Sequence, residues 1–266
     1  MTRLATAVLA ALVAAAPQAF ALEPFKVYDT FSDPSISASR WSDTERTRSI
    51  RAGMLQLVQR SYGLGTSDSG LTFVNWNENL SNPSAVTELR AKIMVNALEV
   101  NTCAANASVS QSRARIIGSF FNVGTPTPGS QVGDVLAQVK LTRFSNSTDP
   151  AGVLRVQGIA SVCTSSDCNA ATTIGNIVDL GTVSVGQATT VQFQWDQPSK
   201  TFFFSRDGGA FSGSVAYPDS DASPPSVPFK QLSTRLDLPS CLSAARVTGF
   251  VDASFDNVLV NASAAP

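Results

Sequence analysis

The chain has 266 residues, a formal net charge of −1, 15% charged residues and no histidine. With 43% hydrophobic residues it has the composition of a folded globular protein, and it lacks the basic excess of nucleic-acid-binding proteins. Without histidine the chain cannot use Ser-His-Asp or Cys-His catalysis, or bind zinc through imidazole ligands.

The N-terminal stretch MTRLATAVLAALVAAAPQAFA predicts an exported protein. It has one arginine, a short alanine-rich apolar run, and Ala19-Phe20-Ala21 in the small-x-small pattern of a signal peptidase site. We expect a bacterial signal peptide over residues 1–21, cleavage after Ala21, and a secreted or periplasmic chain of residues 22–266; a retained apolar helix is the alternative. Later apolar runs fall short of the ~18 residues that a membrane span needs, so no span is predicted.

Beyond residue 22, apolar residues recur at every second position in short runs, separated by clusters of Gly, Pro, Asn, Asp and Ser. This pattern predicts β-strands. In chain order they cover residues 25–31, 49–61, 70–76, 85–98, 112–123, 134–144, 152–163, 177–184, 189–196, 200–207, 229–237 and 245–261. No linker separates them, so we expect one all-β domain over residues 22–266, an antiparallel sandwich.

Alternation sorts the side chains of each predicted strand onto two faces, because neighbouring residues of a strand point in opposite directions. Phe202 and Phe204 share the apolar face, so Phe203 is predicted to be an exposed aromatic on the polar face. The other polar-face candidates for ligand binding are Glu88, Arg90, Lys92, Arg115, Lys140, Arg155, Gln192 and Gln194.

The cations among these residues suggest an anionic ligand. If their strands are neighbours in one sheet, Arg90, Lys92, Arg115, Lys140 and Arg155 line one channel. Guanidinium groups bind carboxylate or sulfate through two hydrogen bonds, which favours an acidic polysaccharide, with a sugar ring resting on the exposed phenylalanine. The alternative is a merely solvated face, which antiparallel sheets commonly have.

A second candidate site surrounds Trp76, which stands among Asn75, Asn77 and Asn79. Indole and amide groups are used in the recognition of neutral sugars, through ring stacking and paired hydrogen bonds. Alternation equally allows Trp76 to lie at the edge of the core, and the sequence leaves both positions open.

Four cysteines follow the predicted signal peptide, at Cys103, Cys163, Cys168 and Cys241. In an exported chain an even number of cysteines predicts disulfides, here with three pairings open. Cys163 and Cys168 flank a short hairpin-like turn, which favours a local bridge and leaves Cys103 to pair with Cys241. A four-cysteine metal site is not favoured, because Cys103 and Cys241 have no close partner in the sequence.

Four segments, YDTFSDPSISASRWSD, AGMLQLV, QFQWDQPSKTFFFSRDG and ASFDNVLVN, resemble bacterial members of the concanavalin A-like lectin/glucanase superfamily. The resemblance spans nearly all of residues 22–266 and consists of strand and turn patterns. It implies a jelly-roll sandwich in which the first and last strands pair and one curved sheet holds a glycan on its concave face. Such a likeness supports a fold better than an activity.

The catalytic motifs of this superfamily are missing or incomplete. Its glucanases carry E-x-D-x-x-E, which this chain lacks, and its closest acidic pairs are expected to be structural. Alginate-lyase jelly rolls carry R-x-E-x-R; here Glu88 and Arg90 match, but Val86 replaces the first arginine, and their Gln-x-His strand cannot occur without histidine. A lyase that uses Tyr62 or Tyr217 as its base stays an alternative.

These observations predict a lectin-like, glycan-binding module with a preference for acidic polysaccharide, and they do not favour an enzyme. The alternatives are a polysaccharide lyase of the alginate-lyase type and a structural or interaction protein of the cell envelope with a protein partner. No cofactor is predicted. The sequence leaves open a structural calcium ion near Asp29, Asp252 and Asp256, although no loop has a recognisable ligand spacing.

Overall fold

The computed structural model describes residues 44–265, which form strands joined by turns and three short 3-10 helices. The strands are β1 (Thr44–Arg51), β2 (Met54–Tyr62), β3 (Leu71–Asn79), β4 (Glu88–Val100), β5 (Gln111–Asn122), β6 (Asp134–Phe144), β7 (Val153–Cys163), β8 (Ala171–Ser184), β9 (Ala188–Asp196), β10 (Thr201–Arg206), β11 (Phe211–Ala216), β12 (Lys230–Pro239) and β13 (Thr248–Val260). The helices are η1 (Pro83–Ala85), η2 (Asp207–Gly209) and η3 (Ala262–Ala264). The predicted signal peptide, its cleavage site, the strand at 25–31 and Asp29 lie outside the described residues.

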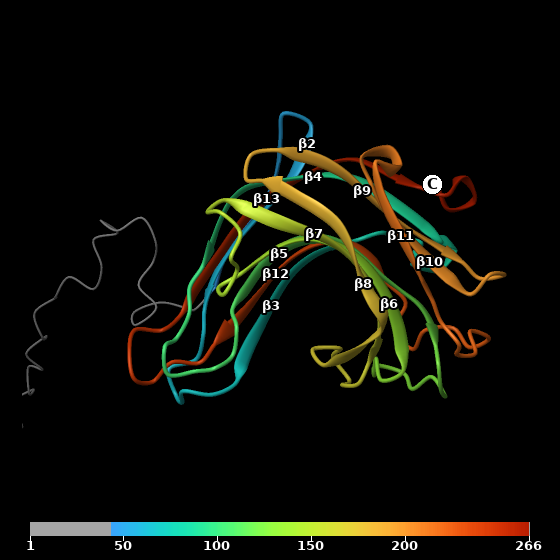
Figure 1. The fold of residues 1–266 in the computed structure, drawn as a ribbon. Helices are drawn as coiled ribbons and strands as arrows, with labels where there is room; N and C mark the ends of the chain where they lie inside the picture. The colour runs from blue at the N-terminus through green and yellow to red at the C-terminus, as the bar shows by residue number, and fades with distance from the viewer. Residues whose placement is uncertain (1–43, 266) are drawn as a thin grey trace, which may run out of the picture. The chain divides into compact units, whose positions relative to one another are not determined.

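The strands form two antiparallel sheets packed face to face. The seven-stranded sheet has the order β1-β2-β13-β4-β9-β10-β11, and the six-stranded sheet has the order β3-β12-β5-β6-β7-β8. Figure 1 shows both sheets curved in the same direction, with the six-stranded sheet on the inner, concave side. The predicted all-β, two-sheet antiparallel sandwich is confirmed. Among residues 44–265, no helix is long and apolar enough to cross a membrane.

Two features of the strand prediction are wrong. Residues 49–61 are not one strand, because Ala52 (φ 48°) and Gly53 (φ 77°) turn the chain back on itself and create the β1–β2 hairpin. Two consecutive positive φ angles are the geometry of a tight hairpin turn, for which glycine is suited. Strand β11 was not predicted, because its sequence FSGSVA is dominated by small residues and has little apolar alternation.

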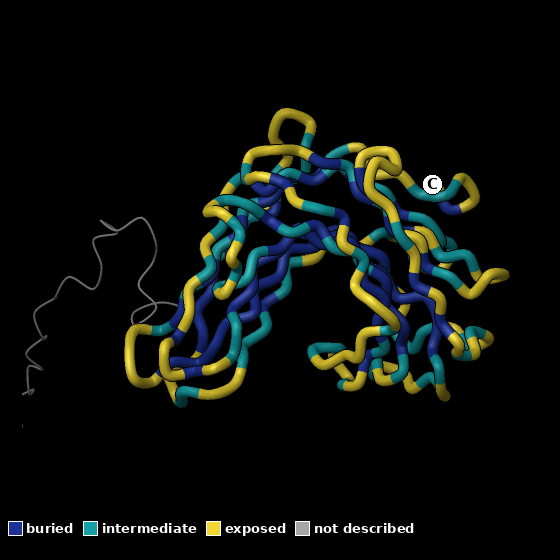
Figure 2. Tube along the Cα trace, viewed as in Figure 1, coloured by how far each residue is buried: buried dark blue, intermediate teal, exposed yellow. Residues whose placement is uncertain are grey.

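The apolar core fills the space between the sheets, as the dark blue segments of Figure 2 indicate. Phe120 and Phe121 both belong to it, although they are neighbours in one strand, because a β-bulge shifts the register of β5 between Ser119 and Phe121. Their rings pack against Phe202 at centroid distances of 5.1 and 6.4 Å. Aromatic packing therefore closes the sandwich where β5 faces β10.

The triplet in β10 follows the alternation expected from the sequence. Phe202 and Phe204 are fully buried, whereas Phe203 is 43% exposed. Phe203 lies opposite Gln194 of β9 and Ser214 of β11, on the outer face of the seven-stranded sheet. The prediction that Phe203 is an exposed aromatic on a polar face is confirmed.

Both disulfides of the favoured pairing are present. Cys103–Cys241 joins the β4–β5 loop to the β12–β13 loop, with a Cα–Cα distance of 5.6 Å. Cys163–Cys168 closes the β7–β8 connection, with a Cα–Cα distance of 4.8 Å. The first links distant parts of the chain, and the second fixes one short loop.

Candidate functional site

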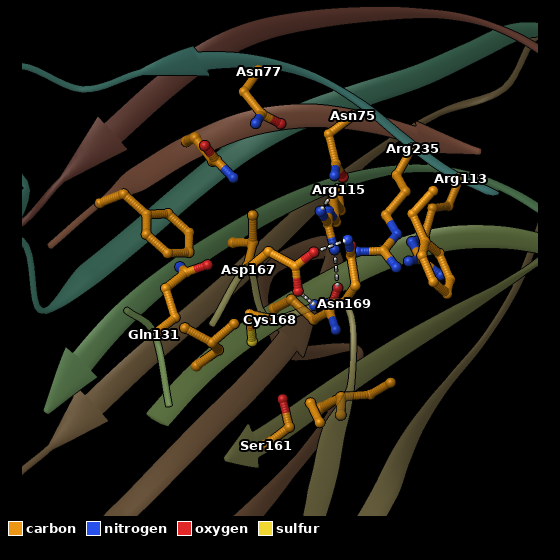
Figure 3. A pocket seen from close by; sticks show the side chains of 18 of the residues that line it. Asn75, Asn77, Arg113, Arg115, Gln131, Ser161, Asp167, Cys168, Asn169 and Arg235 are labelled. Atoms are coloured by element: carbon orange, nitrogen blue, oxygen red, sulfur yellow. Dashed lines mark hydrogen bonds between the residues drawn. The ribbon is translucent and has the colours of Figure 1, made fainter. Parts of the chain in front are cut away.

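The outer face of the six-stranded sheet carries a cavity of about 640 Å³, to which all six strands contribute side chains together with three loop segments. Strand β3 contributes Asn75, Asn77 and Asn79, and Figure 3 shows Asn75 beside Arg115. The neighbouring strands β5 and β12 are buried at every residue, although only one of their faces meets the apolar core. Their other face is a packed polar layer, which forms the floor of the cavity.

Cross-strand register gathers cations on this floor. In one row Asn77, Ser233, Arg115, Lys140 and Gln157 are successive partners across β3, β12, β5, β6 and β7. The next row contains Asn75, Arg235, Arg113, Thr142 and Arg155 across the same strands. Directly opposed residues of antiparallel strands share a face, so four cations meet in the middle of the sheet. Arg113, Arg115 and Arg235 line the cavity, and we call them the floor cations; Lys140 lies beside Arg115 on the same face of the sheet but does not line the cavity.

One carboxylate accompanies the floor cations. Asp237 of β12 forms ion pairs with Arg113 (3.0 Å) and with Arg235 (2.6 Å). Burial by itself would raise the pKa of the Asp237 carboxyl, but the charges of Arg113 and Arg235 outweigh burial and hold its pKa below the usual value. Asp237 is therefore ionised and compensates a minority of the positive charge.

Arg115 is buried among neutral partners. Its guanidinium donates hydrogen bonds to Asn75 Oδ1 (3.0 Å), Gln138 Oε1 (3.1 Å) and Ser233 Oγ (3.4 Å). Burial lowers the pKa of Arg115 well below its ordinary value, and the charge of Arg113 lowers it further. The hydrogen bonds fix the orientation of this guanidinium without neutralising it, and a buried charge of this kind favours an anionic partner.

Lys140 lies directly opposite Arg115 and is 7% exposed. Among the described residues it has no hydrogen-bond acceptor or carboxylate partner, and its ammonium lies 5.4 Å from the centre of the Phe144 ring. Burial lowers the pKa of Lys140 to about 7, and the nearby charge of Arg113 contributes to this. Lys140 thus has fewer interactions than the three floor cations beside it.

The other end of the cavity is apolar and enclosed by two loops. Ile117, Leu136, Ile159 and Phe229 line it, next to the Cys163–Cys168 disulfide. This disulfide closes the loop that brings Asp167 and Asn169 to the cavity, as Figure 3 shows. Within this loop Asp167 accepts hydrogen bonds from Ser165 Oγ (2.7 Å) and Asn169 Nδ2 (2.6 Å).

The facing wall of the cavity is held by a buried carboxylate. Asp134 accepts hydrogen bonds from the backbone N–H groups of Ser226 (2.6 Å) and Val227 (3.0 Å) and from Asn122 Nδ2 (2.8 Å). Buried carboxylates with several N–H donors are well satisfied. Asp134 therefore anchors the segment that carries Val227 and Phe229 to the cavity edge.

The expected single channel of cations is wrong. Arg115, Lys140 and Arg155 share the concave face, but Arg90 and Lys92 lie on β4 in the seven-stranded sheet. The chain crosses from one sheet to the other between β4 and β5, so strands that are consecutive in sequence are not neighbours in space. Arg155 also differs from the floor cations, because it is ion-paired with Asp149 (2.7 Å).

The remaining polar-face candidates form a separate cluster on the outer face of the seven-stranded sheet. There Arg90 donates to Gln192 Oε1 (2.9 Å), and Gln192 Nε2 donates to Glu88 (2.8 Å). Gln194 lies opposite Glu88, and Phe203 opposite Gln194. Glu88, Arg90, Gln192, Gln194 and Phe203 are therefore neighbours, on the opposite side of the sandwich from the floor cations.

Trp76 points away from the cavity that its neighbours line. It packs against the core, and the Arg46 guanidinium lies 5.3 Å from the centre of its ring. Asn75 and Asn77 line the cavity, because alternation places them on the opposite face of β3. The sequence allowed Trp76 to lie either in a sugar-binding site or at the edge of the core. In the structure it lies at the edge of the core.

The two tyrosines considered as bases are buried. Tyr217 packs on Phe121 (4.8 Å between ring centroids) and donates a hydrogen bond to Asp221 (2.6 Å). Burial raises the pKa of Tyr217, and the hydrogen bond to Asp221 raises it further, which makes this phenol a poor base. Tyr62 is also buried and lies near Arg246.

Sequence reasoning missed Arg113, Arg235 and Asp237 as site residues. Arg113 stands two residues before Arg115, so alternation already placed both on one face. The stretch KQLSTRLD likewise places Arg235 and Asp237 on one face of β12. What the sequence did not provide was the pairing of β12 with β5, which joins these residues to Arg113 and Arg115.

The acidic residues Asp252 and Asp256 lie outside the cavity, and their carboxylates interact with neighbouring side chains. Asp252 accepts hydrogen bonds from Gln56 Nε2 (2.9 Å) and Asn96 Nδ2 (2.8 Å), and Asp256 lies 4.0 Å from the Lys92 ammonium. Asp252 and Asp256 are two of the three residues considered for a calcium ion. In the structure amide groups contact the carboxylate of Asp252, and an ammonium group lies near that of Asp256.

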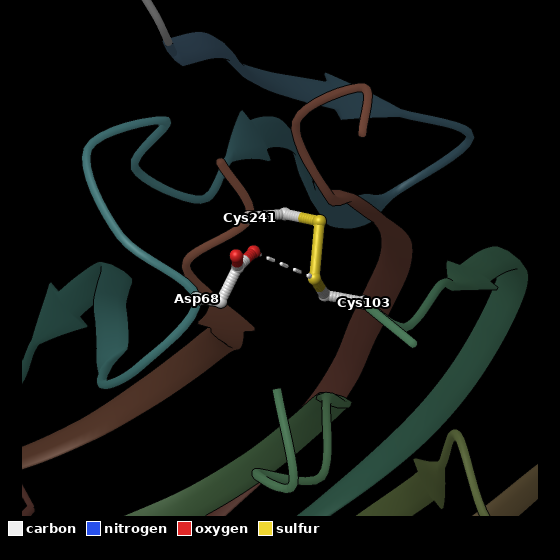
Figure 4. Close-up of side chains that lie close together, drawn as sticks. All are labelled: Asp68, Cys103 and Cys241. Carbon is white, nitrogen blue, oxygen red and sulfur yellow. Dashed lines mark hydrogen bonds between the residues drawn. A yellow bond between two sulfur atoms is a disulfide. The ribbon is translucent and has the colours of Figure 1, made fainter. Parts of the chain in front are cut away.

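Asp68 lies close to the Cys103–Cys241 disulfide, as Figure 4 shows, and accepts hydrogen bonds from the N–H groups of Leu242 (2.9 Å) and Ser243 (3.1 Å). The 3.7 Å contact with Cys103 Sγ is not a hydrogen bond, because a disulfide sulfur carries no hydrogen. For the same reason the two sulfurs are not thiolate ligands for a metal.

No family model and no curated protein matches this sequence. Solved structures with similar architecture include a 1,3-α-1,4-β-D-galactose-4-sulfate-3,6-anhydro-D-galactose 4 galactohydrolase (10% identity, 85% of this chain and 92% of that chain, TM-score 0.33). Others are the carbohydrate recognition domain of Emp47p (9%, 80% and 87%, TM-score 0.32) and a legume lectin-like domain from Entamoeba histolytica (9%, 82% and 89%, TM-score 0.34). At these identities and TM-scores the matches carry no argument about the family, the ligand or the reaction of this chain.

Proposed function

We propose that this chain is a secreted or periplasmic glycan-binding domain that holds an acidic polysaccharide on the concave face of its six-stranded sheet. The observation that carries this proposal is the excess of positive charge on the cavity floor. The three cations that line the cavity, Arg113, Arg115 and Arg235, share one carboxylate, that of Asp237, and Lys140 lies beside Arg115 on the same face of the sheet.

An anionic ligand relieves the electrostatic cost of this arrangement. Buried charges are stable when they are paired, and like charges held together in a medium of low dielectric constant repel strongly. A carboxylate or sulfate group placed over the floor compensates the repulsion and accepts charge-assisted hydrogen bonds. The function that best fits this geometry is therefore recognition of an acid group.

The rest of the cavity suits a sugar chain. Amide side chains surround the cations, and amides both donate and accept hydrogen bonds, as sugar hydroxyls require. They are Asn75, Asn77, Asn79, Gln131, Gln138 and Gln231. The apolar end, at Ile117 and Phe229, offers a surface for the carbon-bound hydrogens of a sugar ring.

The two disulfides support an oxidising compartment outside the cytoplasm. This agrees with the signal peptide predicted over residues 1–21. On this proposal residues 22–266 act as one exported binding domain.

Binding to immobilised polymers tests the proposal. We expect a polyuronate and a sulfated galactan to bind, a neutral β-glucan to bind weakly, and binding to weaken as salt is added. Arg115→Gln is expected to reduce affinity for the acidic polymers about tenfold or more, because a charge-assisted contact is lost. Lack of acidic-polymer binding by the unmodified chain, at any salt concentration, contradicts the proposal.

A matched pair of variants identifies the binding face. Arg90→Gln removes the same charge from the outer face of the seven-stranded sheet, and we expect it to bind the acidic polymers as the unmodified chain does. If Arg90→Gln or Phe203→Ala abolishes binding and Arg115→Gln does not, the site lies on that other face. Absorbance of unsaturated uronate products in the same samples would indicate the lyase alternative.

A further inference from the structure

A second hollow lies beside the cavity on the concave face. It has a volume of about 390 Å³ and is lined by residues of β6, β7 and β8 and of the loop that joins β6 to β7. We call it the β7–β8 hollow. It adjoins the cavity along β7, because Ile159 lines the cavity and Gln157, the preceding residue on the same face of the strand, lines the hollow. Such residues are about 7 Å apart, so one sugar chain can occupy both places.

The balance of charge in the β7–β8 hollow is the reverse of that in the cavity. Asp149 and Asp179 contribute two carboxylates to its lining, and Arg155 contributes one guanidinium. Arg143 also contacts the β6–β7 loop, but its guanidinium donates to the backbone carbonyls of Asp149 and Pro150 and does not line the hollow. The lining of the hollow therefore has an excess of negative charge, whereas the lining of the cavity has an excess of positive charge.

The single guanidinium of the hollow is already engaged. Arg155 donates two hydrogen bonds of 2.7 Å to the carboxylate of Asp149, and these hold the pKa of Asp149 below its usual value. Its second ion pair, with Asp179, is longer at 3.7 Å, and the Asp179 side chain is 62% exposed. An acid group in the hollow would therefore meet a carboxylate of the same sign without a guanidinium free to receive it.

The uncharged lining groups suit a neutral sugar unit. Asn146 and Gln157 carry amides, which both donate and accept hydrogen bonds as sugar hydroxyls require. Phe144 and Ile177 add an aromatic and an aliphatic surface to the lining, and Ile177 is 48% exposed. A sugar ring can rest its carbon-bound hydrogens on such a surface while its hydroxyls reach the amides.

We propose that the bound polysaccharide combines acidic and neutral sugar units, with an acidic unit over the floor cations and a neutral unit in the β7–β8 hollow. The inference rests on the proposed function and narrows its ligand class. A polymer with an acid group on every unit would place one beside Asp179 whenever another lies over the floor cations. This repulsion selects against such a polymer without weakening the attraction in the cavity.

Calorimetry with three oligosaccharides of equal length tests the proposal on the unmodified chain. The probes are an oligogalacturonate, with an acid group on every unit, a hyaluronan fragment, with one on every second unit, and a gellan fragment, with one on every fourth. Attraction between charges alone would rank the oligogalacturonate first. We expect at least one of the two mixed probes to bind about threefold or more tightly than the oligogalacturonate, because its neutral unit avoids the repulsion.

A charge-removing variant assigns this preference to the hollow. Asp179→Asn removes the exposed carboxylate and keeps an oxygen that accepts the hydrogen bond from the N–H of Gly181 (2.9 Å). It should raise affinity for the oligogalacturonate roughly three- to tenfold and leave that for the preferred mixed probe within about twofold. The matched control is Asp256→Asn, which removes the same charge from the seven-stranded sheet, near Lys92, and should change neither affinity.

A second variant tests the contact with the neutral unit. Ile177→Ser removes an exposed aliphatic surface from the hollow, so we expect the fold to be retained. It should reduce affinity for the preferred mixed probe by about threefold, because less apolar surface is covered on binding. Unchanged affinity for that probe would contradict the placement of a sugar unit against Ile177.

The outcomes separate this inference from the proposed function. If the unmodified chain binds none of the three probes, both proposals fail. If it binds them in order of their number of acid groups, or if Asp179→Asn leaves the ratio of the affinities unchanged, only the assignment of a neutral unit to the hollow fails. Preference for a mixed probe, lost in Asp179→Asn and kept in Asp256→Asn, supports it.

Discussion

At the scale of single residues, packing leaves little freedom around Phe204. Gly158 of β7 lies under its ring, and a Cβ atom built on Gly158 overlaps the ring carbons. Gly158 is in a strand with ordinary backbone geometry, so the lack of a side chain is needed for space and not for an unusual φ. The close approach of β7 to β10 depends on this glycine.

The first prediction concerns this contact. Gly158→Ala should reduce the free energy of unfolding by about 1–3 kcal/mol, because the core must shift to admit the methyl group. Urea-induced unfolding measures the change. The control is Gly124→Ala, where the nearest atom to a built Cβ is 3.6 Å away and we expect a change within about 0.5 kcal/mol. Equal effects in both variants would contradict the packing argument.

The second prediction concerns pH and the buried lysines. Lys230 is 2% exposed, and burial lowers its pKa from 10.5 to about 7, as happens for Lys140. Between these values the unfolded chain binds more protons than the folded chain, so stability should rise as pH increases from about 7 to about 10. Urea midpoints at both ends of this window measure the rise.

Lys230→Met should reduce this pH dependence and leave the part that is due to Lys140. The methionine preserves the packing of the lysine stem over Phe120, whose ring centre lies 4.1 Å from the ammonium. An unchanged slope in the variant would show that Lys230 is charged in the folded protein.

At the scale of strands and loops, the cavity wall depends on one side chain. Asp134 satisfies two backbone N–H groups, those of Ser226 and Val227, at the start of the segment that leads to Phe229 and β12. Its removal leaves buried donors without an acceptor. The stability of this wall and the shape of the cavity are therefore linked.

The third prediction follows from this contact. Asp134→Ala should cost about 3 kcal/mol or more of stability and speed hydrogen exchange at the Ser226 and Val227 amides. Affinity for an acidic polymer should also fall, since the wall moves. The control is Asp219→Ala, in the loop after β11, which should change neither quantity. Slow exchange at the two amides in Asp134→Ala would contradict the assigned role.

The strands show what could be predicted from the sequence. Alternation assigned the two faces of β4, β6, β7 and β9 correctly, and those of β5 as far as its bulge after Ser119, because burial of one face has a period of two residues. Alternation could not show to which of the two sheets a strand belongs, because buried and exposed side chains alternate in the same way in both sheets. This is why Arg90 and Arg115, similar in sequence context, were expected together and are found on opposite sides of the sandwich.

Local exceptions escaped the same reasoning for physical reasons. The turn at Ala52 and Gly53 interrupts an alternating run without a strong turn sequence, and the bulge in β5 brings Phe120 and Phe121 to one side. The floor cations could be recognised as polar-face residues, but their association depends on the β12–β5 pairing between segments far apart in the chain.

At the scale of the whole molecule, the two disulfides have different expected effects. Cys103–Cys241 joins residues 138 positions apart, whereas Cys163–Cys168 joins residues 5 positions apart. In the chain-entropy model a bridge stabilises more when it closes a longer loop. The long-range bridge therefore contributes to the stability of the fold, and the short one mainly fixes the loop at the cavity.

The fourth prediction compares the two bridges. Replacing Cys103 and Cys241 by serine should cost roughly 5 kcal/mol, and replacing Cys163 and Cys168 roughly 2 kcal/mol. The second pair should reduce affinity for the acidic polymer more than the first, because its loop carries Asp167 and Asn169 to the cavity. Unfolding and binding curves on both variants test this, and the reverse ranking in either measurement would contradict it.

The packed layer of like charges gives ionic strength two opposite effects on this protein. Salt screens the repulsion among the floor cations, although less than it would at the surface because these cations are buried, and so stabilises the empty sandwich by a small amount. Salt also screens the attraction between those cations and an acidic chain, and so favours release. The ligand-free domain is then most stable at high salt, where it binds its ligand least tightly. At low salt binding is favoured and the ligand-free fold is less stable.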